Sequence, residues 1–487
     1  MTTTDLFILL PFVILTAGIV SIMLTIAFYR NHLLTLVLTL VTLCLCFASL
    51  PLVSSADSPH VTSLLIVDGY ALFFIGLLLA AAIVIAILSY GYLENRLIIN
   101  EEFYIFLLIA TLGCCVLVSS SHLASFFLAL EILSISLYAL IAYPKLIPNH
   151  IEAAIKYLIL AGVSTAFLLF GMALIYAQLG TMHLSLIMLM LAKIPDLYNP
   201  FFLAAVIMIL IGIGFKLAFV PLHLWAPDIY EGAPAPVTAF IAASSKGAVF
   251  ALLLRYFTVL DIHHYMPLFI IFSIIAVSSM FFGNLLALLQ NNIKRILAYS
   301  SIAHLGYLLV AFLASGSLAV VAVTFYIVSY FAATLGAFGV ITVLSGKITD
   351  LDKIEDYRGL AFNHPALAAV FTASLFSLAG IPLTAGFIGK FYLLSAGVSS
   401  SLWLLIIILI INSSIGLFYY LRIIFTLYSK PLEPLSEFLS ADSQFLLTSY
   451  RQASGLVLAL LTLLILWLGI YPNHVINLIK TVANSIY

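Results

Sequence analysis

Long apolar runs alternate with short polar or Pro/Gly-containing breaks along almost the whole chain. A helix that crosses a bilayer needs about 20 apolar residues, because each residue advances the helix by about 1.5 Å. The pattern therefore predicts an all-α polytopic membrane protein with about fourteen transmembrane helices. The predicted spans are 5–27, 32–54, 69–92, 102–120, 122–143, 151–178, 200–222, 235–258, 265–288, 293–314, 317–345, 365–397, 402–428 and 453–472.

Composition supports a lipid exterior and one continuous bundle. Hydrophobic residues make up 64% of the 487 residues and charged residues 8%, whereas a soluble domain has about 25% charged residues. The longest polar interruptions, 346–364 and 429–452, are too short to bury cores of their own. The net charge of −1 gives no electrostatic reason to expect nucleic-acid binding. The N-terminus lacks the basic region of a cleaved signal peptide, so we expect the first helix to be retained.

Basic residues are distributed unevenly over the predicted connections. Counted from an external N-terminus, the cytoplasmic connections hold Arg30, Arg96, Lys145, Lys294, Arg295, Lys347, Lys353, Arg358, Lys430 and Arg451. The opposite side holds Lys193, Arg255 and Lys480. Because cytoplasmic loops carry the excess of Lys and Arg, we expect a multi-pass protein of the bacterial inner membrane with both termini in the periplasm.

A few ionisable residues fall inside the apolar runs. Glu131, Lys216, Lys246 and Lys390 are the clearest, and such residues in a bilayer are costly unless they are paired or hydrated. Burial favours the neutral form of an amine or a carboxyl, whereas a nearby opposite charge favours the charged form. A glutamate that approaches or leaves a lysine would therefore switch its proton affinity, which is the basis of a proton relay. Lys156 and Arg422 lie near span ends, where they either join the relay or reach the interface.

Two predicted spans contain helix breakers beside a lysine. Pro221 follows Lys216 and Pro382 precedes Lys390, and proline removes a backbone donor and clashes with the preceding turn. Paired broken helices are typical of transport sites between inverted repeats. The breaks fall in the seventh and twelfth spans, and an odd repeat of five helices is inverted in the membrane. We therefore expect N-terminal helices 1–3 (1–101), a repeat of helices 4–8 (102–260), an inverted repeat of helices 9–13 (261–430) and a final helix (431–487).

Two histidines are further candidates. His304 follows the polar run Tyr299-Ser300-Ser301, and His223 lies beside the first break, where it could link Lys216 with Lys246. Histidine can shuttle protons near neutral pH, but a buried histidine can equally be a hydrogen-bonded packing residue.

No Gly-rich phosphate loop and no Cys or His spacing typical of a cluster or haem occurs. Cys44, Cys46, Cys114 and Cys115 lie in apolar runs, where small buried side chains are expected. We therefore expect no redox centre in this chain.

Several segments in order resemble the antiporter-like membrane subunits of respiratory complex I. They are LALEILSISLYAL around Glu131, FKLAFVPLHLWAPDIYEGAP around Lys216, SSKGAVFALLLR around Lys246, KRILAYSSIAHLGY around His304 and AGIPLTAGFIGKFYLL around Lys390. The resemblance covers about residues 60 to 430. Lys390 favours the N-type (ND2-type) members, because the M-type subunit has a glutamate there and the L-type carries a long lateral helix after its bundle.

The resemblance implies a translocase subunit with roles for these residues. Glu131 and Lys216 would form a gating ion pair, and Lys246 would be the central proton carrier. His304 would connect two half-channels, and Lys390 would be the terminal lysine on the exit side. FMN, iron–sulfur clusters and quinone would lie in partner subunits. The partners would include the M-type antiporter-like subunit, the small K-type subunit and the lipid bilayer.

Two other functions fit the same pattern. A subunit of a multisubunit cation/proton antiporter would share the fold but need no NADH. A structural spacer would use its buried charges only to hold helices together, so that neutral substitutions at Lys216 and Lys390 would change stability but not coupling.

Overall fold

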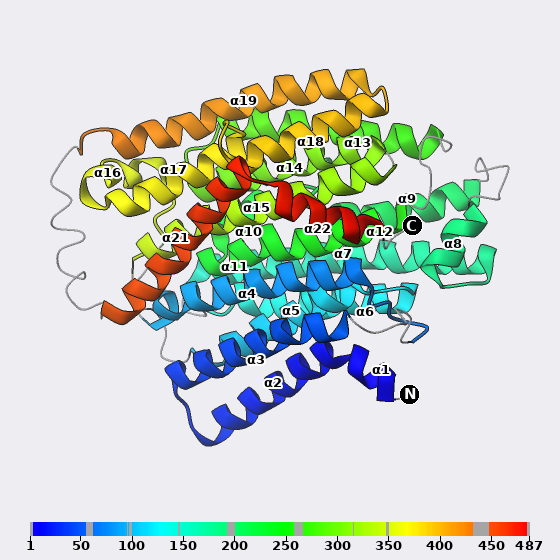
Figure 1. Cartoon of the computed structure of the whole chain (residues 1–487), viewed down its shortest axis with the longest axis horizontal. Helices are drawn as coiled ribbons and strands as arrows, with labels where there is room; N and C mark the ends of the chain where they lie inside the picture. The colour runs from blue at the N-terminus through cyan, green and yellow to red at the C-terminus, as the bar shows by residue number, and fades with distance from the viewer. Residues whose placement is uncertain are drawn as a thin grey trace.

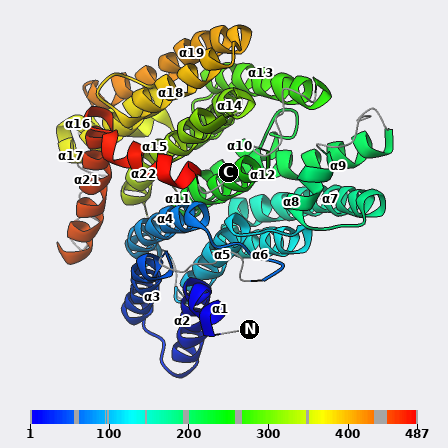
Figure 2. The ribbon, with the colours of Figure 1, turned by 45° about the vertical axis from the view of Figure 1, so that its right-hand side comes forward.

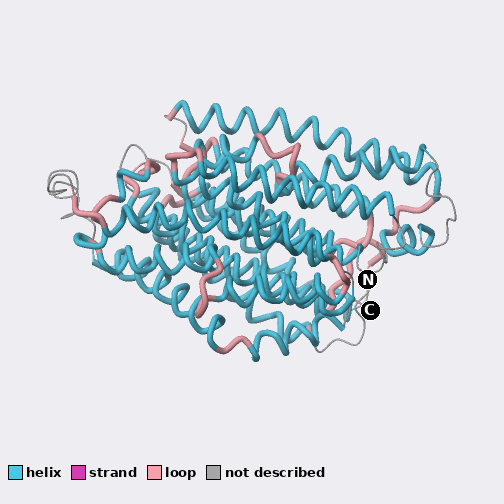
Figure 3. Tube along the Cα trace, turned by 90° about the horizontal axis from the view of Figure 1, so that it is seen from above, coloured by secondary structure: helices cyan, strands magenta, loops and turns pink. Residues whose placement is uncertain are grey.

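The structure, a computed structural model, describes residues 3–54, 62–94, 96, 100–144, 147–191, 200–257, 266–314, 316–346, 350–431 and 448–484. Within these ranges the regular elements are helices, most of which run roughly along one direction (Figures 1 and 3). Lys145, Lys193 and Lys347, which contributed to the expected orientation, lie outside the described residues, as does the side chain of Arg451. The all-α prediction is confirmed.

Twelve helical segments of the described chain are long and apolar enough to cross a membrane. They are α2 (Leu10–Phe28), α3 (His32–Val53), α4 (Gly69–Glu94), α6 (Leu123–Ile141), α7 (Pro148–Leu179), α9 (Pro200–Leu217), α11–α12 (Ala235–Phe257), α13 (Met266–Leu288), α14 (Ile293–Ala314), α15 (Gly316–Leu344), α19 (Trp403–Tyr428) and α21 (Thr448–Ile470). Two shorter apolar helices, α5 (Glu102–Val118) and α17 (Pro365–Ala379), occupy the remaining predicted spans.

The predicted break in span 365–397 is present, because this span consists of two helices, α17 and α18 (Ala385–Ser399). The hydrophobic pattern did not predict the further short helices. The other short helices are α1 (Thr3–Ile8), α8 (Leu184–Leu191), α10 (Trp225–Gly232), η3 (Ile354–Tyr357), α16 (Leu360–Asn363) and α22 (Asn473–Asn484). Helix α22 buries Ile476, Ile479 and Ala483 and packs across α15 and α4 (Figure 1).

The bundle has an interior layer of helices that meet little lipid. The apolar windows of α11–α12 and α14 are entirely buried, and that of α15 is 89% buried. A helix that is apolar all round belongs in the interior of a large membrane bundle. Helices α2 and α3 lie at one edge and α19 at the opposite edge (Figure 2), and exposed apolar side chains such as Leu24, Val41 and Phe425 face outward from them.

A buried ion cluster joins three elements at one end of the bundle. Asp350 accepts hydrogen bonds from Arg96 at 2.8 Å, from Lys294 at 2.7 Å and from the Tyr92 hydroxyl at 2.9 Å. The side chains of Arg96, Lys294 and Asp350 are only 3%, 2% and 5% exposed. Lys294 was counted with a cytoplasmic connection, but it lies buried in the first turn of α14 and also donates to the Ala233 carbonyl. The cluster thus fixes α4, α14 and the segment after α15 together.

The four cysteines are free thiols in the described chain. Cys46, Cys114 and Cys115 are buried as expected, whereas Cys44 is exposed on the surface of α3. The expectation of burial was therefore wrong for Cys44, which lies on the outward face of a helix at the edge of the bundle.

Candidate functional site

The first helix break lies immediately after Lys216. Helix α9 ends at Leu217, Ala218 adopts the left-handed conformation with φ of 57°, and α10 starts at Trp225. The break frees backbone groups that lipid could not satisfy. The Trp225 indole N–H donates to the Phe215 carbonyl at 2.8 Å, and such bonds explain how irregular backbone persists inside the bundle.

The second break is closed by a candidate residue. Helix α17 ends at Ala379, Gly380 follows with φ of 82°, and α18 begins at Ala385. Lys390 Nζ donates to the Ala379 carbonyl at 2.8 Å and to Ser413 Oγ at 2.8 Å. An amine at the carbonyl end of a helix also interacts favourably with the helix dipole. Lys390 therefore supplies a hydrogen-bond donor to a free carbonyl at the end of α17, and it is also a candidate proton carrier.

Substituting Gly380 with alanine is expected to disturb this arrangement. A Cβ on Gly380 would lie 2.8 Å from Lys390 Cδ, and the positive φ disfavours any L side chain. We expect Gly380→Ala to destabilise the protein by about 1–2 kcal/mol and to lower coupled activity by displacing Lys390. Thermal unfolding and pumping assays of the purified complex check this prediction. Gly162→Ala is the matched control, since its Cβ would meet nothing within 4 Å; equal behaviour of the two variants would contradict the prediction.

Lys216 and Glu131 lie near each other, but the side chain that bonds Lys216 directly is a serine. Lys216 Nζ donates to Ser134 Oγ at 2.5 Å, and it lies 5.2 Å from the centre of the Tyr157 ring. Ser134 stands three residues after Glu131 on α6, while Glu131 accepts a hydrogen bond from Thr165 at 2.9 Å. No ion pair joins these two described residues. Lys216 therefore bonds Ser134, which lies one helical turn after Glu131 on α6.

Lys246 is buried next to an irregular turn. Residues Ile241–Ser245 form one turn of π-helix, η1, and Lys246 begins α12 directly after it. Such π-turns are frequent at functional sites. Lys246 Nζ donates to Ser301 Oγ at 2.6 Å and lies 5.2 Å from the centre of the Tyr230 ring. Among the described carboxylates, none forms an ion pair with Lys246.

His304 connects two tyrosines from distant parts of the chain. Its Nδ1 shares a 2.5 Å hydrogen bond with the Tyr326 hydroxyl, and its Nε2 shares a 3.0 Å hydrogen bond with the Tyr420 hydroxyl. The Tyr420 hydroxyl also shares a 2.5 Å hydrogen bond with Ser300 Oγ. Both nitrogens are occupied, so His304 is a hydrogen-bonded core residue in this structure and also part of a continuous polar chain.

Helix α14 lies beside three of the candidates, because it carries His304 and its side chains contact Lys246 and Lys390. Ser301, His304 and Tyr307 stand at positions i, i+3 and i+6 of α14, and such residues lie near one another along one face of a helix. Ser301 bonds Lys246, and the Tyr307 ring centre lies 5.3 Å from Lys390 Nζ. We call Ser301, His304 and Tyr307 the α14 ladder. The rings of His304 and Tyr307 lie 5.5 Å apart, so the ladder lies between the lysine of α12 and the lysine of α18.

The remaining candidates stand apart from this ladder. His223 is 6% exposed, and neither ring nitrogen makes a well-formed hydrogen bond with a described residue, although the Pro221 carbonyl lies near the ring. No hydrogen bond from it reaches Lys216 or Lys246 in the described chain. Lys156 is half-exposed and pairs with Glu152 at 2.7 Å and with Asp228 at 3.5 Å. Arg422 donates to the Leu288 and Gln290 carbonyls at the end of α13.

Comparison with known proteins places the chain in a family. The transmembrane model of the NADH:quinone oxidoreductase/Mrp antiporter family matches residues 120–416. The NADH-quinone oxidoreductase subunit N of Nitrosospira multiformis is 52% identical over 98% of this chain and 96% of its own length. The chain belongs to the subunit N family of NADH-quinone oxidoreductases.

Solved structures agree with the subunit N family at the level of the fold. A chain of respiratory complex I from Thermus thermophilus with bound aureothin is 31% identical and has a TM-score of 0.78, covering 96% of this chain and 98% of its own. A chain of the Mrp complex from Dietzia sp. has a TM-score of 0.83 at 19% identity, covering 100% and 98%. The second likeness shows only that this chain of the Mrp complex shares the fold.

The sequence did not single out the neutral partners of this subunit N family member. Ser134, Ser301, Tyr326 and Tyr420 directly contact the candidate lysines or His304. Helical spacing offered a partial signal, because Ser134 lies three residues after Glu131 and Ser301 three before His304. Tyr326 and Tyr420 are on other helices, and nothing in their local sequence marks them.

Proposed function

We propose that the chain is a membrane-arm subunit of a proton-translocating NADH:quinone oxidoreductase, and that Glu131, Lys216, Lys246, His304 and Lys390 carry its protons. The observation that carries this proposal is the α14 ladder, in which Ser301 bonds Lys246 and the Tyr307 ring lies beside both His304 and Lys390. Hydroxyl and imidazole groups both donate and accept hydrogen bonds, so we propose that they pass the proton, with water bridging the steps that no direct hydrogen bond joins.

Coupling is proposed to act through Glu131 and Lys216. Ser134 now holds Lys216, so a small shift of α6 relative to α9 would exchange this hydroxyl for the Glu131 carboxylate. A change in the distance between a carboxylate and an amine changes the proton affinity of both groups. Quinone reduction in other subunits would drive that shift, and the proton would then move towards Lys246. His223, beside the first break, is the proposed contact between Lys216 and Lys246.

Partner subunits are proposed to cover the two ends of the relay. Glu131 is half-buried on a face of α6 that also exposes Leu128 and Ile135, at 56% and 61%. Lys390 lines a groove between α17, α18 and α19, beside the exposed side chain of Phe391. We propose that the M-type antiporter-like subunit and the small K-type subunit pack on these faces. FMN, iron–sulfur clusters and quinone are proposed for partner subunits, since no described group of His, Cys, Asp and Glu is arranged as metal ligands.

The proposed setting is the bacterial inner membrane, with both termini in the periplasm. The proposed repeats are 102–260 and 261–430, preceded by 1–101 and followed by 431–487. One break lies in each repeat, at 218–224 and at 380–384, which supports an equivalent role for the two halves.

Removing the Glu131 carboxylate tests the proposal. We expect Glu131→Ala to leave assembly intact and to lower NADH-driven quinone reduction and proton pumping by at least about tenfold, because loss of a proton-transfer group typically costs about 10²–10⁴ in rate. The measurement is NADH oxidation and pumping by the purified complex in vesicles. Glu152→Gln is the matched control, because Glu152 is 64% exposed and pairs only at the surface of α7. Wild-type coupled activity of Glu131→Ala would sink the proposal.

A cation/proton antiporter subunit is the second candidate, favoured by the fold shared with the Mrp chain. Co-purification discriminates the two functions. Under the leading proposal the tagged chain brings hydrophilic subunits that contain flavin and iron–sulfur clusters. An antiporter would lack these subunits and would instead exchange sodium or potassium for protons without NADH.

A further inference from the structure

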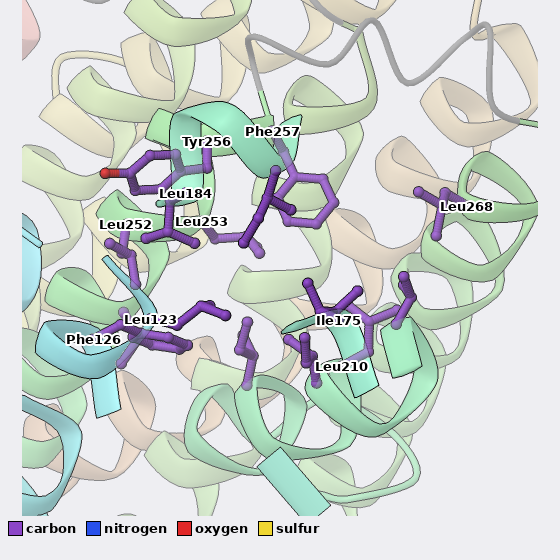
Figure 4. Close-up of a pocket in the computed structure, with 15 residues that line it drawn as sticks. Leu123, Phe126, Ile175, Leu184, Leu210, Leu252, Leu253, Tyr256, Phe257 and Leu268 are labelled. Atoms are coloured by element: carbon purple, nitrogen blue, oxygen red, sulfur yellow. The ribbon is translucent and has the colours of Figure 1, made fainter. Parts of the chain in front are cut away.

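An apolar cavity lies between helices α6, α7, α8, α9, α12 and α13 (Figure 4). Its volume is about 80 Å³, and the atom-free space including its mouth is about 780 Å³. Leu123, Ile175, Leu210, Leu253 and Leu268 are among the side chains that line it (Figure 4). The lining is aliphatic and aromatic throughout.

The cavity offers no binding site for water. Tyr256 supplies the single hydroxyl of the lining, and this hydroxyl already donates to the Ser120 carbonyl at 2.5 Å. A buried water needs two to four polar partners. Water is therefore a poor occupant, although the space is large enough for it.

The mouth of the cavity opens towards lipid. Ile209 and Leu210 on α9 line the cavity and are half-buried. Neighbouring positions on α9 and α13 present exposed aliphatic side chains, with Ile207 at 40%, Ile270 at 47% and Ile274 at 61%. In a membrane-spanning bundle such a surface is in contact with hydrocarbon chains. We propose that one acyl chain of a membrane phospholipid occupies this cavity.

The dimensions fit one chain. The lining residues of α12 extend from Val249 to Phe257, which corresponds to about 12 Å along a helix axis. This is less than half of the hydrocarbon thickness of about 30 Å, so a chain would enter from one leaflet only. Val249 lies three residues after Lys246, so the lipid chain would fill the space one turn from the central lysine without wetting it.

Photo-labelling tests this inference in the intact complex. Phosphatidylethanolamine with a diazirine in its acyl chain is incorporated into vesicles, and the cross-linked peptides are mapped by mass spectrometry. We expect labelling of the α9 and α12 residues that line the cavity, and at least a fivefold loss in Leu210→Trp, whose indole would fill it. Ile207→Trp is the matched control, because Ile207 lies on the same helix outside the cavity. Equal cavity labelling in the two variants would overturn the inference.

A second variant keeps the test informative if the tryptophan disturbs folding. Leu210→Cys is treated with a hydrophilic, membrane-impermeant maleimide, with the wild-type protein and its exposed Cys44 as background. A lipid-filled cavity predicts no modification above this background. Modification of Cys at position 210 would show a water-filled cavity and overturn the inference. Neither readout needs turnover, so both stand apart from the proposed proton relay.

Discussion

Lys246→Met is expected to lower proton pumping and coupled quinone reduction by at least about tenfold while the complex still assembles. Lys246 donates to Ser301 at the start of the α14 ladder, and no methionine atom can carry a proton from that position. Loss of a proton-transfer group costs about 10²–10⁴ in rate. Replacing a buried charge with an apolar side chain of similar volume is often neutral for stability, so the defect should appear in transport. Reconstituted complex, assayed for NADH oxidation and for vesicle acidification, gives the measurement.

Two further variants make this result specific. Lys156→Met removes a lysine that is half-exposed and paired with Glu152 at the surface, so it should retain wild-type pumping. Ser301→Ala keeps Lys246 but removes its hydroxyl partner, and we expect an intermediate defect. If Lys246→Met pumped normally, or if Lys156→Met were equally impaired, the central role of Lys246 would be refuted.

Asp350→Ala is expected to produce the largest loss of stability. The substitution would leave Arg96 and Lys294 buried without their shared carboxylate. Breaking a buried ion pair by removing one partner typically costs about 3–5 kcal/mol. We therefore expect a low yield of assembled complex and a lower unfolding temperature, measured by thermal denaturation in detergent. Asp352→Asn is the matched control. Asp352 lies two residues after Asp350, but its side chain accepts a hydrogen bond from Asn292 and is not part of the cluster of Arg96, Lys294 and Asp350.

The same cluster predicts a dependence of stability on pH. Burial alone would raise the pKa of Asp350, but the charges of Lys294 and Arg96 outweigh it and hold this pKa well below its ordinary value. A lowered folded-state pKa contributes stability that is present above the unfolded value of about 3.9 and is lost as the pH falls further. The wild-type protein should therefore lose stability between about pH 5 and pH 3, and Asp350→Asn should lose less.

The pKa of Asp352 is shifted in the opposite direction from that of Asp350. Burial raises the pKa of Asp352 above its ordinary value, so its ionised form does not stabilise the fold as that of Asp350 does. Asp352→Asn should thus retain the full loss of stability at low pH. If Asp350→Asn and the wild-type protein showed the same decline in unfolding temperature, the assignment of the decline to this cluster would be wrong.

Much of the fold could be predicted because lipid imposes a simple length rule. Apolar runs located the crossing helices, and proline beside Lys216 and near Lys390 located the two breaks. The candidate residues stood out for the same reason, since a charge inside an apolar run is rare and costly. The rule fails where helices do not cross: α22 packs across α15 and α4, and its apolar residues are too few to form a span.

The partners of the candidate residues required the tertiary structure. Helix α14 is apolar and buried on every side, so its hydrophobic pattern does not show which face meets α12, α18 or α19. The rotation and register of packed helices decide that Ser301 meets Lys246 and that His304 meets Tyr326 and Tyr420. Likewise, the count of basic residues placed Lys294 in a cytoplasmic connection, whereas its ammonium group donates to Asp350, which lies 56 residues away in the chain.

The sequence alone determined that this protein lies in a membrane, where its helices cross and break, and that Lys216, Lys246 and Lys390 are buried there. These conclusions depend on local length and composition, which the scarcity of water inside a bilayer makes decisive. Only the tertiary structure decided which hydroxyls and rings those side chains contact, that Lys216 bonds Ser134 rather than Glu131, and that an apolar cavity remains near Lys246. Those features arise from side-chain packing between helices that are far apart in the chain, and no local sequence pattern specifies this packing.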